Sequence, residues 1–366
     1  MNDRCNYQNK YDKINKYYYE SNILKNMNQN HFYQDDYNQD NKVTYKYEED
    51  SKNKYKFYYD NNFGQDDYGL KYIDNFGYGY KCTKYKVEFP EQEQDTQPGM
   101  EYLMHPRPIF DNPNYKSSNK LKDKVAIITG GDSGIGRAVA ISYVKEGAKV
   151  VIAYLNEERD ARETEQYIKS LGGDCMLISG DIKDRKICDY IVSETIRKYG
   201  KIDILVNNAG VQYQQKSLLD ISDEQFDQTM KTNMYSIFYL TRSALKYMLP
   251  GSSIINVSSV TTFYGEPELI DYVTSKGAII GFTRSLSTNL ADKKIRVNAV
   301  APGYFWTALQ PACWEKEKIP TLGADAPMKR AGQTYEIAPL FVYLASDDSS
   351  YVTGQVMHIN GGLYKG

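Results

Sequence analysis

The sequence predicts an α/β fold: a doubly wound parallel sheet of about seven strands, preceded by a low-complexity N-terminal segment. Two observations lead to this prediction. The composition changes sharply near residue 121, and after that point short apolar runs alternate regularly with segments of helical pattern. Such alternation is typical of parallel strands joined by right-handed helical crossovers. A sheet of this kind carries helices on both faces and binds ligands at the carboxyl ends of its strands.

The first part of the chain, residues 1–96, has too few aliphatic side chains to build a core. Leu, Ile, Val and Phe together supply 12 of the first 90 residues, whereas the same residues hold 17 of the 35 tyrosines. A segment of this composition, rich also in Asn, Lys and Gln, does not bury enough apolar surface to offset the entropy lost on ordering. We therefore expect residues 1–96 to be disordered.

A proline-containing stretch separates this segment from the globular part. Residues 97–120 hold prolines at positions 98, 106, 108 and 113, and we expect them to form an extended arm. The first alanine of the chain is Ala126, and from residue 121 onward the composition is rich in Ala, Val, Ile and Gly. Residues 121–366 are long enough to bury a substantial core as one domain.

Glycines mark the helix ends in the first half of this domain. Gly147 ends one helical pattern, and Gly172 with Gly173 ends the next. Buried strands are read from short runs of Val, Ile and Ala between these helices. In chain order, we expect a strand at 124–129, a helix at 134–146, a strand at 149–154, a polar helix ending at 171, a strand at 175–178, a helix at 184–199 and a strand at 202–206.

The second half of the domain begins with a long helix. Ser222 and Gln225 have the spacing of a capping box, which predicts the start of this helix, and Pro250–Gly251 predicts its end. The remaining elements follow the same alternation. We expect a strand at 253–257, a helix at 270–290, a strand at 295–300, a helix at 335–345 and a strand at 355–359.

A glycine-rich turn follows the first strand and opens the first helix. In Thr129-Gly-Gly-Asp-Ser-Gly-Ile-Gly136, Gly130 permits the tight turn, Gly134 lets a pyrophosphate approach the backbone, and Gly136 lets helix and strand pack closely. The N–H groups and the dipole at the helix start favour anionic phosphates. The turn therefore predicts a Rossmann-type dinucleotide site, with Ser133 and Ile135 among its contacts.

Tyr272 and Lys276 lie four residues apart on a predicted helix and so share one face. A phenol titrates near 10, too high for a base at neutral pH. We expect the Lys276 ammonium to favour the phenolate and to lower the pKa of Tyr272. The pair would then act as a general acid/base near neutral pH.

Three motifs in order resemble those of the classical short-chain dehydrogenase/reductases. They are the glycine turn, Asn207-Asn-Ala-Gly210 after the fourth strand, and Tyr272-x-x-x-Lys276, and the resemblance covers residues 121–366. The arm sequence Gln97-Pro-Gly-Met-Glu101 and the end Thr353-Gly-Gln-Val-Met-His-Ile-Asn-Gly-Gly362 are similar to the bacterial general-stress and glucose/ribitol dehydrogenase-like branch. Nothing in that branch resembles residues 1–96.

The resemblance implies roles for single residues. Tyr272 protonates a carbonyl oxygen, Lys276 also holds the nicotinamide ribose, and Ser259, rather than its neighbour Ser258, orients the substrate. Asn233 supports a water relay to the lysine; asparagine is a poor residue for a helix interior, which suits a functional role. The other implied cofactor contacts are Asp181 with Ile182, the loop residues Asn208, Ala209 and Gly210, Val257, Pro302 with Gly303, and Thr307.

The nicotinamide cofactor is NADP or NAD. The ribose 2′ position is read after the second strand, where Leu155 and Asn156 are neither acidic nor basic, although Glu157 and Glu158 follow. The pattern leans slightly to NADP. Aromatic residues near the expected pocket are either substrate contacts or packing beneath a mobile loop at 304–330, and the sequence favours neither: Tyr213, Phe263, Tyr264, Tyr304 and Trp306.

Several classes of partner are not expected. The net charge of −2 gives no reason to expect nucleic acid, and the longest apolar runs fall far short of a membrane span. The five cysteines lie far apart without a Cys-x-x-Cys pair, so we expect reduced thiols, no metal site and a cytoplasmic protein. The resemblance implies a homotetramer with a small-molecule substrate.

The predicted function is hydride transfer between a nicotinamide and a small alcohol or carbonyl compound, such as an aldehyde, ketone, sugar or polyol. Two alternatives remain: a catalytically idle nucleotide-binding module, and a coat- or assembly-associated protein that uses the tyrosine-rich tail. The composition of residues 1–96 is better explained by an AT-rich gene, since Asn, Lys and Tyr have AT-rich codons. The sequence decides neither the substrate nor the physiological direction of the reaction.

Overall fold

The computed structural model describes residues 44–50, 54–60 and 89–366. The chain divides into two units, Met1–Tyr72 and Ile73–Gly366. In the first unit, β1 (Thr44–Asp50) and β2 (Lys54–Asp60) pair antiparallel, which the expectation of disorder for residues 1–96 did not foresee. Tyr, Thr and Phe favour strands, and this pair is rich in them. The rest of that expectation, up to residue 88, lies outside the described residues.

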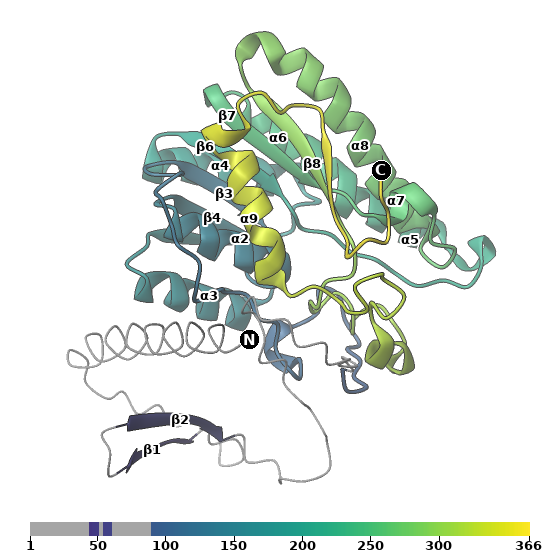
Figure 1. Cartoon of the computed structure of the whole chain (residues 1–366). Coiled ribbons are helices and arrows are strands. Elements are labelled where there is room, and N and C mark those ends of the chain that lie inside the picture. Colours follow the sequence, from purple (N-terminus) through teal and green to yellow (C-terminus); the bar gives the residue numbers. More distant parts are fainter. Residues whose placement is uncertain (1–43, 51–53, 61–88) are drawn as a thin grey trace, which may run out of the picture. The chain divides into compact units, whose positions relative to one another are not determined.

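The second unit contains the predicted parallel sheet (Figure 1). Its seven strands run in the order β5-β4-β3-β6-β7-β8-β9, and every neighbouring pair is parallel. From β3 the chain first builds the sheet outward on one side, through β4 and β5, and then on the other, from β6 to β9. Such a switch point leaves a crevice at the carboxyl ends of β3 and β6. The strands are β3 (Val125–Thr129), β4 (Lys149–Tyr154), β5 (Cys175–Ser179), β6 (Ile202–Asn207), β7 (Met248–Val257), β8 (Arg296–Pro302) and β9 (Val356–Ile359).

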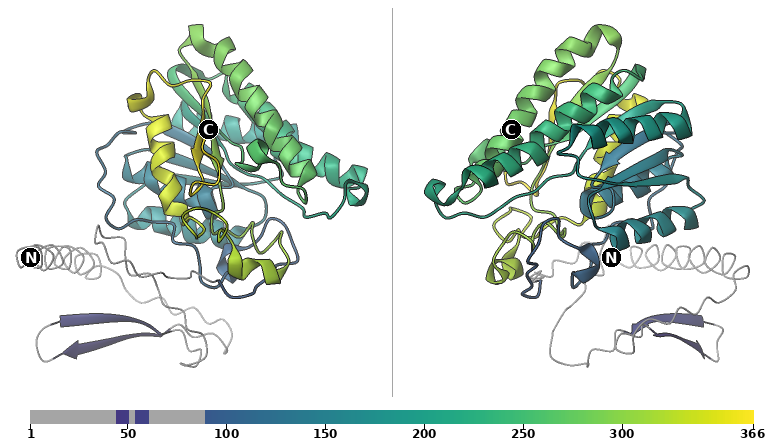
Figure 2. Two further views of the ribbon diagram at one scale, coloured as in Figure 1. Left: turned by 45° about the vertical axis from the view of Figure 1, so that its right-hand side comes forward. Right: turned by 180° about the vertical axis from the view of Figure 1, so that it is seen from behind.

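Helices cover both faces of this sheet, so the doubly wound fold is confirmed (Figure 2). Alternate strand residues enter different cores: Ile128 packs with one set of helices, and Ile127 with the other. The first set is α2 (Gly134–Lys145), α3 (Glu158–Ser170) and α9 (Thr334–Ala345). The second is α4 (Arg185–Tyr199), α6 (Ser236–Ala244) and α8 (Ile270–Leu290).

The long helix expected from Ser222 to Pro250 is interrupted. It consists of α5 (Asp223–Met230), the π-helical turn η3 (Lys231–Tyr235) and α6, and it ends at Ala244. Pro250 and Gly251 lie within β7, whose first residue pairs with Ile202 across a register shift. The helix is therefore shorter than predicted, because the chain turns after Ala244 and adds a strand before the proline.

Only half of the predicted capping box at the start of α5 forms. The Ser222 hydroxyl accepts a hydrogen bond from the Gln225 backbone N–H at 3.1 Å. The Gln225 side chain instead donates to the Asp271 carboxylate at 3.0 Å, and so ties α5 to α8. A complete box is present at the start of α9, between Gln333 and Glu336.

The segment before the sheet packs against the domain well upstream of residue 97. We call residues 89–107 the strap. The Phe89 ring stacks on Trp306, with 3.8 Å between ring centroids and an interplanar angle of 7°. The Gln94 N–H donates to the Pro311 carbonyl at 2.8 Å, and the Trp306 indole N–H donates to the Pro106 carbonyl at 2.8 Å. Residues 89–96 thus pack against the domain, contrary to the expectation of disorder for this part of residues 1–96.

A chain that begins at Phe89 should fold and keep full activity, whereas one that begins at Glu93 should be less stable. The shorter chain loses the buried Phe89 ring, whose burial contributes about 1.5–3 kcal/mol. Thermal unfolding of the two truncated proteins and of the full chain tests this. Equal melting temperatures for the two truncated proteins would contradict it.

Candidate active site

A cavity of about 240 Å³ lies at the carboxyl ends of the strands. Its walls come from the turn after β3, the ends of β4 and β5, the loop at 208–216 after β6, the end of β7, helix α8, the segment at 303–333 after β8, and the strap. This is where ligands bind in doubly wound sheets. Of the predicted site residues, these line it: Gly130, Ser133, Gly134, Ile135, Asp181, Ile182, Asn208, Ala209, Gly210, Val257, Ser259, Tyr272, Lys276, Pro302, Gly303 and Thr307.

The glycine turn fits a dinucleotide. Gly130 and Gly134 have φ angles of +62° and +53°, a conformation that side chains with a Cβ disfavour. A Cβ on Gly136 would lie 1.9 Å from the Gly130 carbonyl oxygen, so helix and turn could not approach as they do. Gly136 therefore acts behind the cavity wall, and the N-terminus of α2 faces the cavity at Ser133 and Gly134.

Two loop residues hold this turn in place. The Asn208 side-chain amide donates to the carbonyl oxygens of Thr129 and Gly130, at 2.9 and 3.1 Å. The Thr129 hydroxyl accepts from the backbone N–H groups of Asn208 and Ala209. The Asn-Asn-Ala-Gly motif thus braces the turn after β3 through hydrogen bonds to its backbone.

Two carboxyl groups lie at the expected ribose end of the cavity. Asp132 is buried, and its Oδ2 has no hydrogen-bond partner among the described residues. Burial raises the pKa of Asp132 to about 8, and the nearby Glu157 carboxylate adds to the increase. Glu157 accepts from the backbone N–H groups of Leu155 and Asn156, at 3.0 and 2.8 Å. The sequence interpretation considered Leu155 and missed Asp132.

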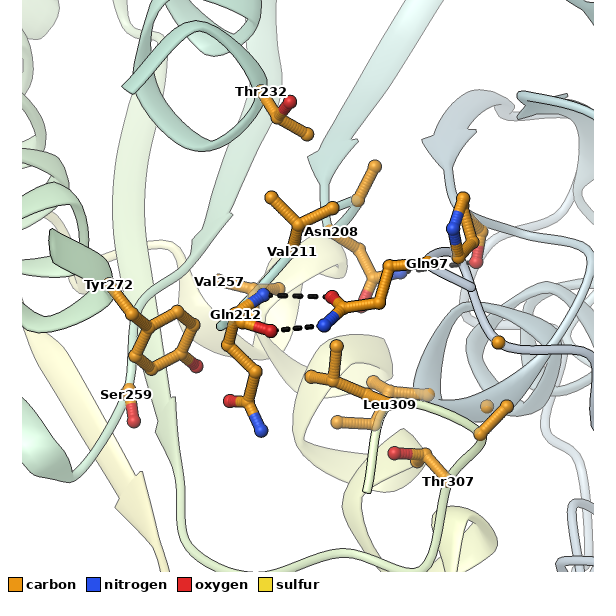
Figure 3. Close-up of a pocket in the computed structure, with 18 of the residues that line it drawn as sticks. Gln97, Asn208, Val211, Gln212, Thr232, Val257, Ser259, Tyr272, Thr307 and Leu309 are labelled. Atoms are coloured by element: carbon orange, nitrogen blue, oxygen red, sulfur yellow. Dashed lines mark hydrogen bonds between the residues drawn. The ribbon is translucent and has the colours of Figure 1, made fainter. Parts of the chain in front are cut away.

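Tyr272 is buried in the cavity wall beside Ser259 (Figure 3). Burial raises the pKa of Tyr272 to about 12, and the Ser259 hydroxyl beside it opposes this increase. The expected lowering of the pKa by Lys276 is not found. The Lys276 ammonium lies 5.6 Å from the centroid of the Tyr272 ring and donates to the Val257 carbonyl at 2.9 Å. At neutral pH the phenol is therefore protonated, the form that donates a proton.

Lys276 is buried, and burial lowers its pKa to about 8. A Cβ built on Gly210 would lie 3.2 Å from its ammonium nitrogen and 3.2 Å from the Asn233 side-chain oxygen. Gly210 is thus the residue that lets the loop pass between these two polar groups.

Asn233 lies in the π-helical turn and is fully buried behind the cavity wall. Its side chain accepts from the Val211 N–H at 2.8 Å and donates to the Val211 carbonyl and to the Ser275 hydroxyl, both at 2.9 Å. It thereby fixes the 208–216 loop against α8. Single π-turns inside helices often occur at functional sites.

The two serines after β7 have different partners. Ser259 faces Tyr272 and accepts from the Thr261 hydroxyl at 2.8 Å. Ser258 donates to the Lys276 carbonyl at 2.9 Å and so belongs to the packing against α8. This arrangement favours Ser259 as the residue that meets a substrate.

Of the five aromatic residues left open by the sequence, Tyr213 does not line the cavity, and the other four divide into two groups. Tyr264 and Tyr304 line the cavity. Trp306 packs under the strap, and Phe263 packs against His358 and Tyr364. Further cavity residues that the sequence did not single out as contacts are Gln97, Pro98, Gly99, Lys183, Gln212 and Trp314.

Neither a metal site nor a membrane segment is found in the described part of the chain. No group of three or more His, Cys, Asp or Glu side chains there is arranged to hold a metal ion. Within the same residues, no helix is both long and apolar enough to cross a bilayer.

The fold and the cavity define a Rossmann-type dinucleotide-binding domain. A family model described as enoyl-(acyl carrier protein) reductase matches residues 130–364. General stress protein 39 of Bacillus subtilis is 50% identical over 282 residues, 77% of this chain and 99% of that protein. Glucose and ribitol dehydrogenase of Daucus carota is 46% identical, over 75% of this chain and 97% of that protein. The chain belongs to the short-chain dehydrogenase/reductase family, and it is an oxidoreductase.

A solved structure supports the same assignment. A short-chain dehydrogenase from Burkholderia cenocepacia, in complex with NADP, superposes with a TM-score of 0.63 and 27% identity. The match covers 66% of this chain and 98% of that chain. The similarity to general stress protein 39 and to glucose and ribitol dehydrogenase confirms the branch that the sequence indicated.

Proposed function

We propose that this oxidoreductase interconverts a small alcohol and its carbonyl compound, with Tyr272 as the general acid/base. The observation that carries this proposal is the position of the Tyr272 phenol in the wall of the cavity, beside Ser259. When bound, the nicotinamide supplies or accepts the hydride. The substrate class is an aldehyde, ketone, sugar or polyol.

Each side chain has a separate task in this proposal. The Tyr272 hydroxyl donates its proton to the carbonyl oxygen during reduction and takes it back during oxidation. The Ser259 hydroxyl holds that oxygen next to the phenol. Lys276, anchored on the Val257 carbonyl, keeps a positive charge near the phenol and is within reach of a ribose. Asn233 keeps the loop at Val211 in register with α8.

A screen of alcohols and carbonyl compounds, read out by cofactor oxidation or reduction, tests the reaction class. An idle nucleotide-binding module would show cofactor binding without turnover. The relatives named as dehydrogenases and the oxidoreductase assignment do not favour this alternative, nor a coat- or assembly-associated role.

For the cofactor, we propose NADP or NAD with weak discrimination and a slight preference for NADP. The Burkholderia relative that binds NADP supports this preference. The raised pKa of Asp132, about 8, is compatible with NADP, because a protonated carboxyl does not repel a 2′-phosphate at neutral pH.

The preference should therefore depend on pH. At pH 7 the ratio of kcat/KM for the two cofactors should lie within about tenfold, or roughly 1.4 kcal/mol. Above the Asp132 pKa of about 8, the ionised carboxylate should repel the 2′-phosphate, so the KM for NADP should rise relative to that for NAD. Steady-state kinetics with both cofactors from below to above this pKa measure the ratio.

Asp132→Asn is the matched control, since it keeps the shape and removes the titration. Its cofactor ratio should be flat across the same pH range. A preference of several hundredfold in the wild type, or the same pH dependence in the variant, would show that another group reads the ribose.

We also propose that the protein is a homotetramer. Aromatic side chains on α5, η3 and α6 are exposed, among them Phe226, Tyr235 and Phe238, and exposed apolar surfaces are typical of interfaces between subunits. Light scattering coupled to size-exclusion chromatography measures the assembly. The cytoplasmic location stays an expectation from the sequence.

A further inference from the structure

The strap contributes Gln97, Pro98 and Gly99 to the wall of the cavity, and Gln97 alone of these hydrogen-bonds to other segments through its side chain (Figure 3). In this view the Gln97 amide reaches from the strap toward the backbone of Gln212, and Leu309 lies below it. Gln97 is separated in sequence from Gln212 by 115 residues and from Ala312 by 215. It therefore joins three parts of the chain at the cavity.

The hydrogen bonds of Gln97 connect two opposite walls. Its amide oxygen accepts from the Gln212 N–H at 3.0 Å, and its amide nitrogen donates to the Gln212 carbonyl. The same nitrogen donates to the Ala312 carbonyl at 3.1 Å. Gln212 belongs to the 208–216 loop beside Tyr272, and Ala312 to the 303–333 segment. One side chain thus satisfies three backbone groups on two walls, which a glutamine amide can do because it has both donors and an acceptor.

The strap contacts the domain on both sides of Gln97, and these contacts fix the position of the Gln97 backbone. Toward the N-terminus, Gln94 hydrogen-bonds to the Pro311 carbonyl. Toward the C-terminus, a Cβ on Gly99 would lie 2.4 Å from the Ala308 carbonyl oxygen, so the backbones are in close contact. The buried Glu101 carboxylate accepts from the Gly134 N–H at 2.6 Å, at the dinucleotide turn.

We propose that Gln97 is a positioning residue of the active site: it ties the 208–216 loop to the 303–333 segment and so controls how fast the cofactor and the substrate enter and leave. The proposal rests on the proposed function only for its substrate part. Tyr272 makes no hydrogen bond to Gln97, so the proton-transfer step itself does not depend on this residue.

The test uses two substitutions of Gln97 in the full chain. Gln97→Met keeps the length of the side chain and removes all three hydrogen bonds. Gln97→Glu keeps the acceptor for the Gln212 N–H but places oxygen against the Gln212 and Ala312 carbonyls. Glu93→Gln and Asp95→Asn are matched controls, because both side chains are exposed on the same strap.

Release of NADPH, and of NADH in a second series, is followed by energy transfer from tryptophan after mixing with excess oxidised cofactor. Trp306 and Trp314 are the two tryptophans of the chain, and Trp314 lines the cavity. Both Gln97 variants should release the reduced cofactor about tenfold faster, as expected from the loss of two or three hydrogen bonds. The two controls should release it at the wild-type rate.

A second measurement separates positioning from general damage. With the best carbonyl substrate from the screen, KM should rise for both Gln97 variants, while single-turnover hydride transfer at saturation stays within about twofold of wild type. Unchanged release and KM would overturn the proposal, as would an equal change in the controls. If no substrate were turned over, the proposed function would fail, whereas the release rates would still test Gln97.

Discussion

Replacing Tyr272 with phenylalanine should lower turnover by at least about 10²–10⁴-fold, the range that general acid/base groups contribute. The change removes only the hydroxyl, so the packing of the buried ring should hardly alter. The carbonyl oxygen would then have no proton donor beside Ser259. Cofactor binding should survive, because the turn at Gly130–Gly136 is untouched. Steady-state kinetics, with cofactor affinity measured separately by titration, check both parts.

Two further variants distinguish the roles around this phenol. Lys276→Ala should lower turnover and cofactor affinity together, since the proposed function gives the ammonium a role both near the phenol and at the ribose. Ser259→Ala should lower turnover with cofactor affinity nearly intact. If Tyr272→Phe kept more than about a tenth of wild-type turnover, against the range for general acid/base catalysis, the assignment of Tyr272 would be wrong.

Arg137→Met should cause the largest loss of stability, about 3–5 kcal/mol in the free energy of unfolding. The Arg137 guanidinium is buried and donates to the Glu101 carboxylate at 2.6 Å, to the Asp160 carbonyl at 2.8 Å and to the Asp132 carbonyl at 2.8 Å. Methionine fills much of the space but leaves the buried carboxylates of Glu101 and Asp160 without this cation. The half-exposed Arg107 remains nearby at 3.5–3.7 Å and compensates only in part.

Chemical denaturation of the full chain measures this loss. Arg162→Met on α3 is the control: its ion pairs with Glu158 and Glu165 are solvent-exposed, so the free energy of unfolding should hardly change. In the double variant Arg137→Met/Glu101→Gln the losses should be less than additive, because the orphaned charge is removed. Equal effects of Arg137→Met and Arg162→Met would contradict the argument.

The fold could be predicted from the sequence nearly in full, because most buried strands are compact runs rich in Val, Ile and Ala, and the helices of the first half, α2, α3 and α4, are followed by glycine. The element that the prediction misplaced is the helix after Ser222. Its end depends on a tertiary event, the pairing of Met248 with Ile202, which no local pattern reports. The π-turn around Asn233 was not predicted either. Its side chain hydrogen-bonds to the backbone of Val211, a contact between segments that are distant in the sequence.

The site residues that belong to sequence motifs could be predicted, whereas those contributed by segments distant in the sequence could not. Gly130, Tyr272 and Lys276 were placed together because their spacing is local or belongs to a known pattern. Gln97 and Asp132 were missed as cavity residues, since their roles depend on neighbours far along the chain or on burial. The lowered pKa expected for Tyr272 is not found for the same reason: desolvation, which the sequence does not show, raises the pKa, and the lysine four residues away is not among the groups that shift it.

The strap has a consequence for the order in which a newly made chain becomes functional. The strap leaves the ribosome before any strand of the seven-stranded sheet. Its partners Trp306, Pro311 and Ala312 are synthesised some 200 residues later; Pro106 and Trp306, for example, are 200 residues apart. Glu101 can meet Gly134, Arg137 and Asp160 earlier. At about 5–20 residues per second, however, Phe89, Gln94 and Gln97 wait roughly 10–40 s for their partners beyond residue 305. During that time Phe89 has no ring to stack on. Chaperones that bind exposed aromatic segments should therefore bind the nascent chain at the strap. A nascent chain arrested before residue 306 should be cleaved by protease within the strap.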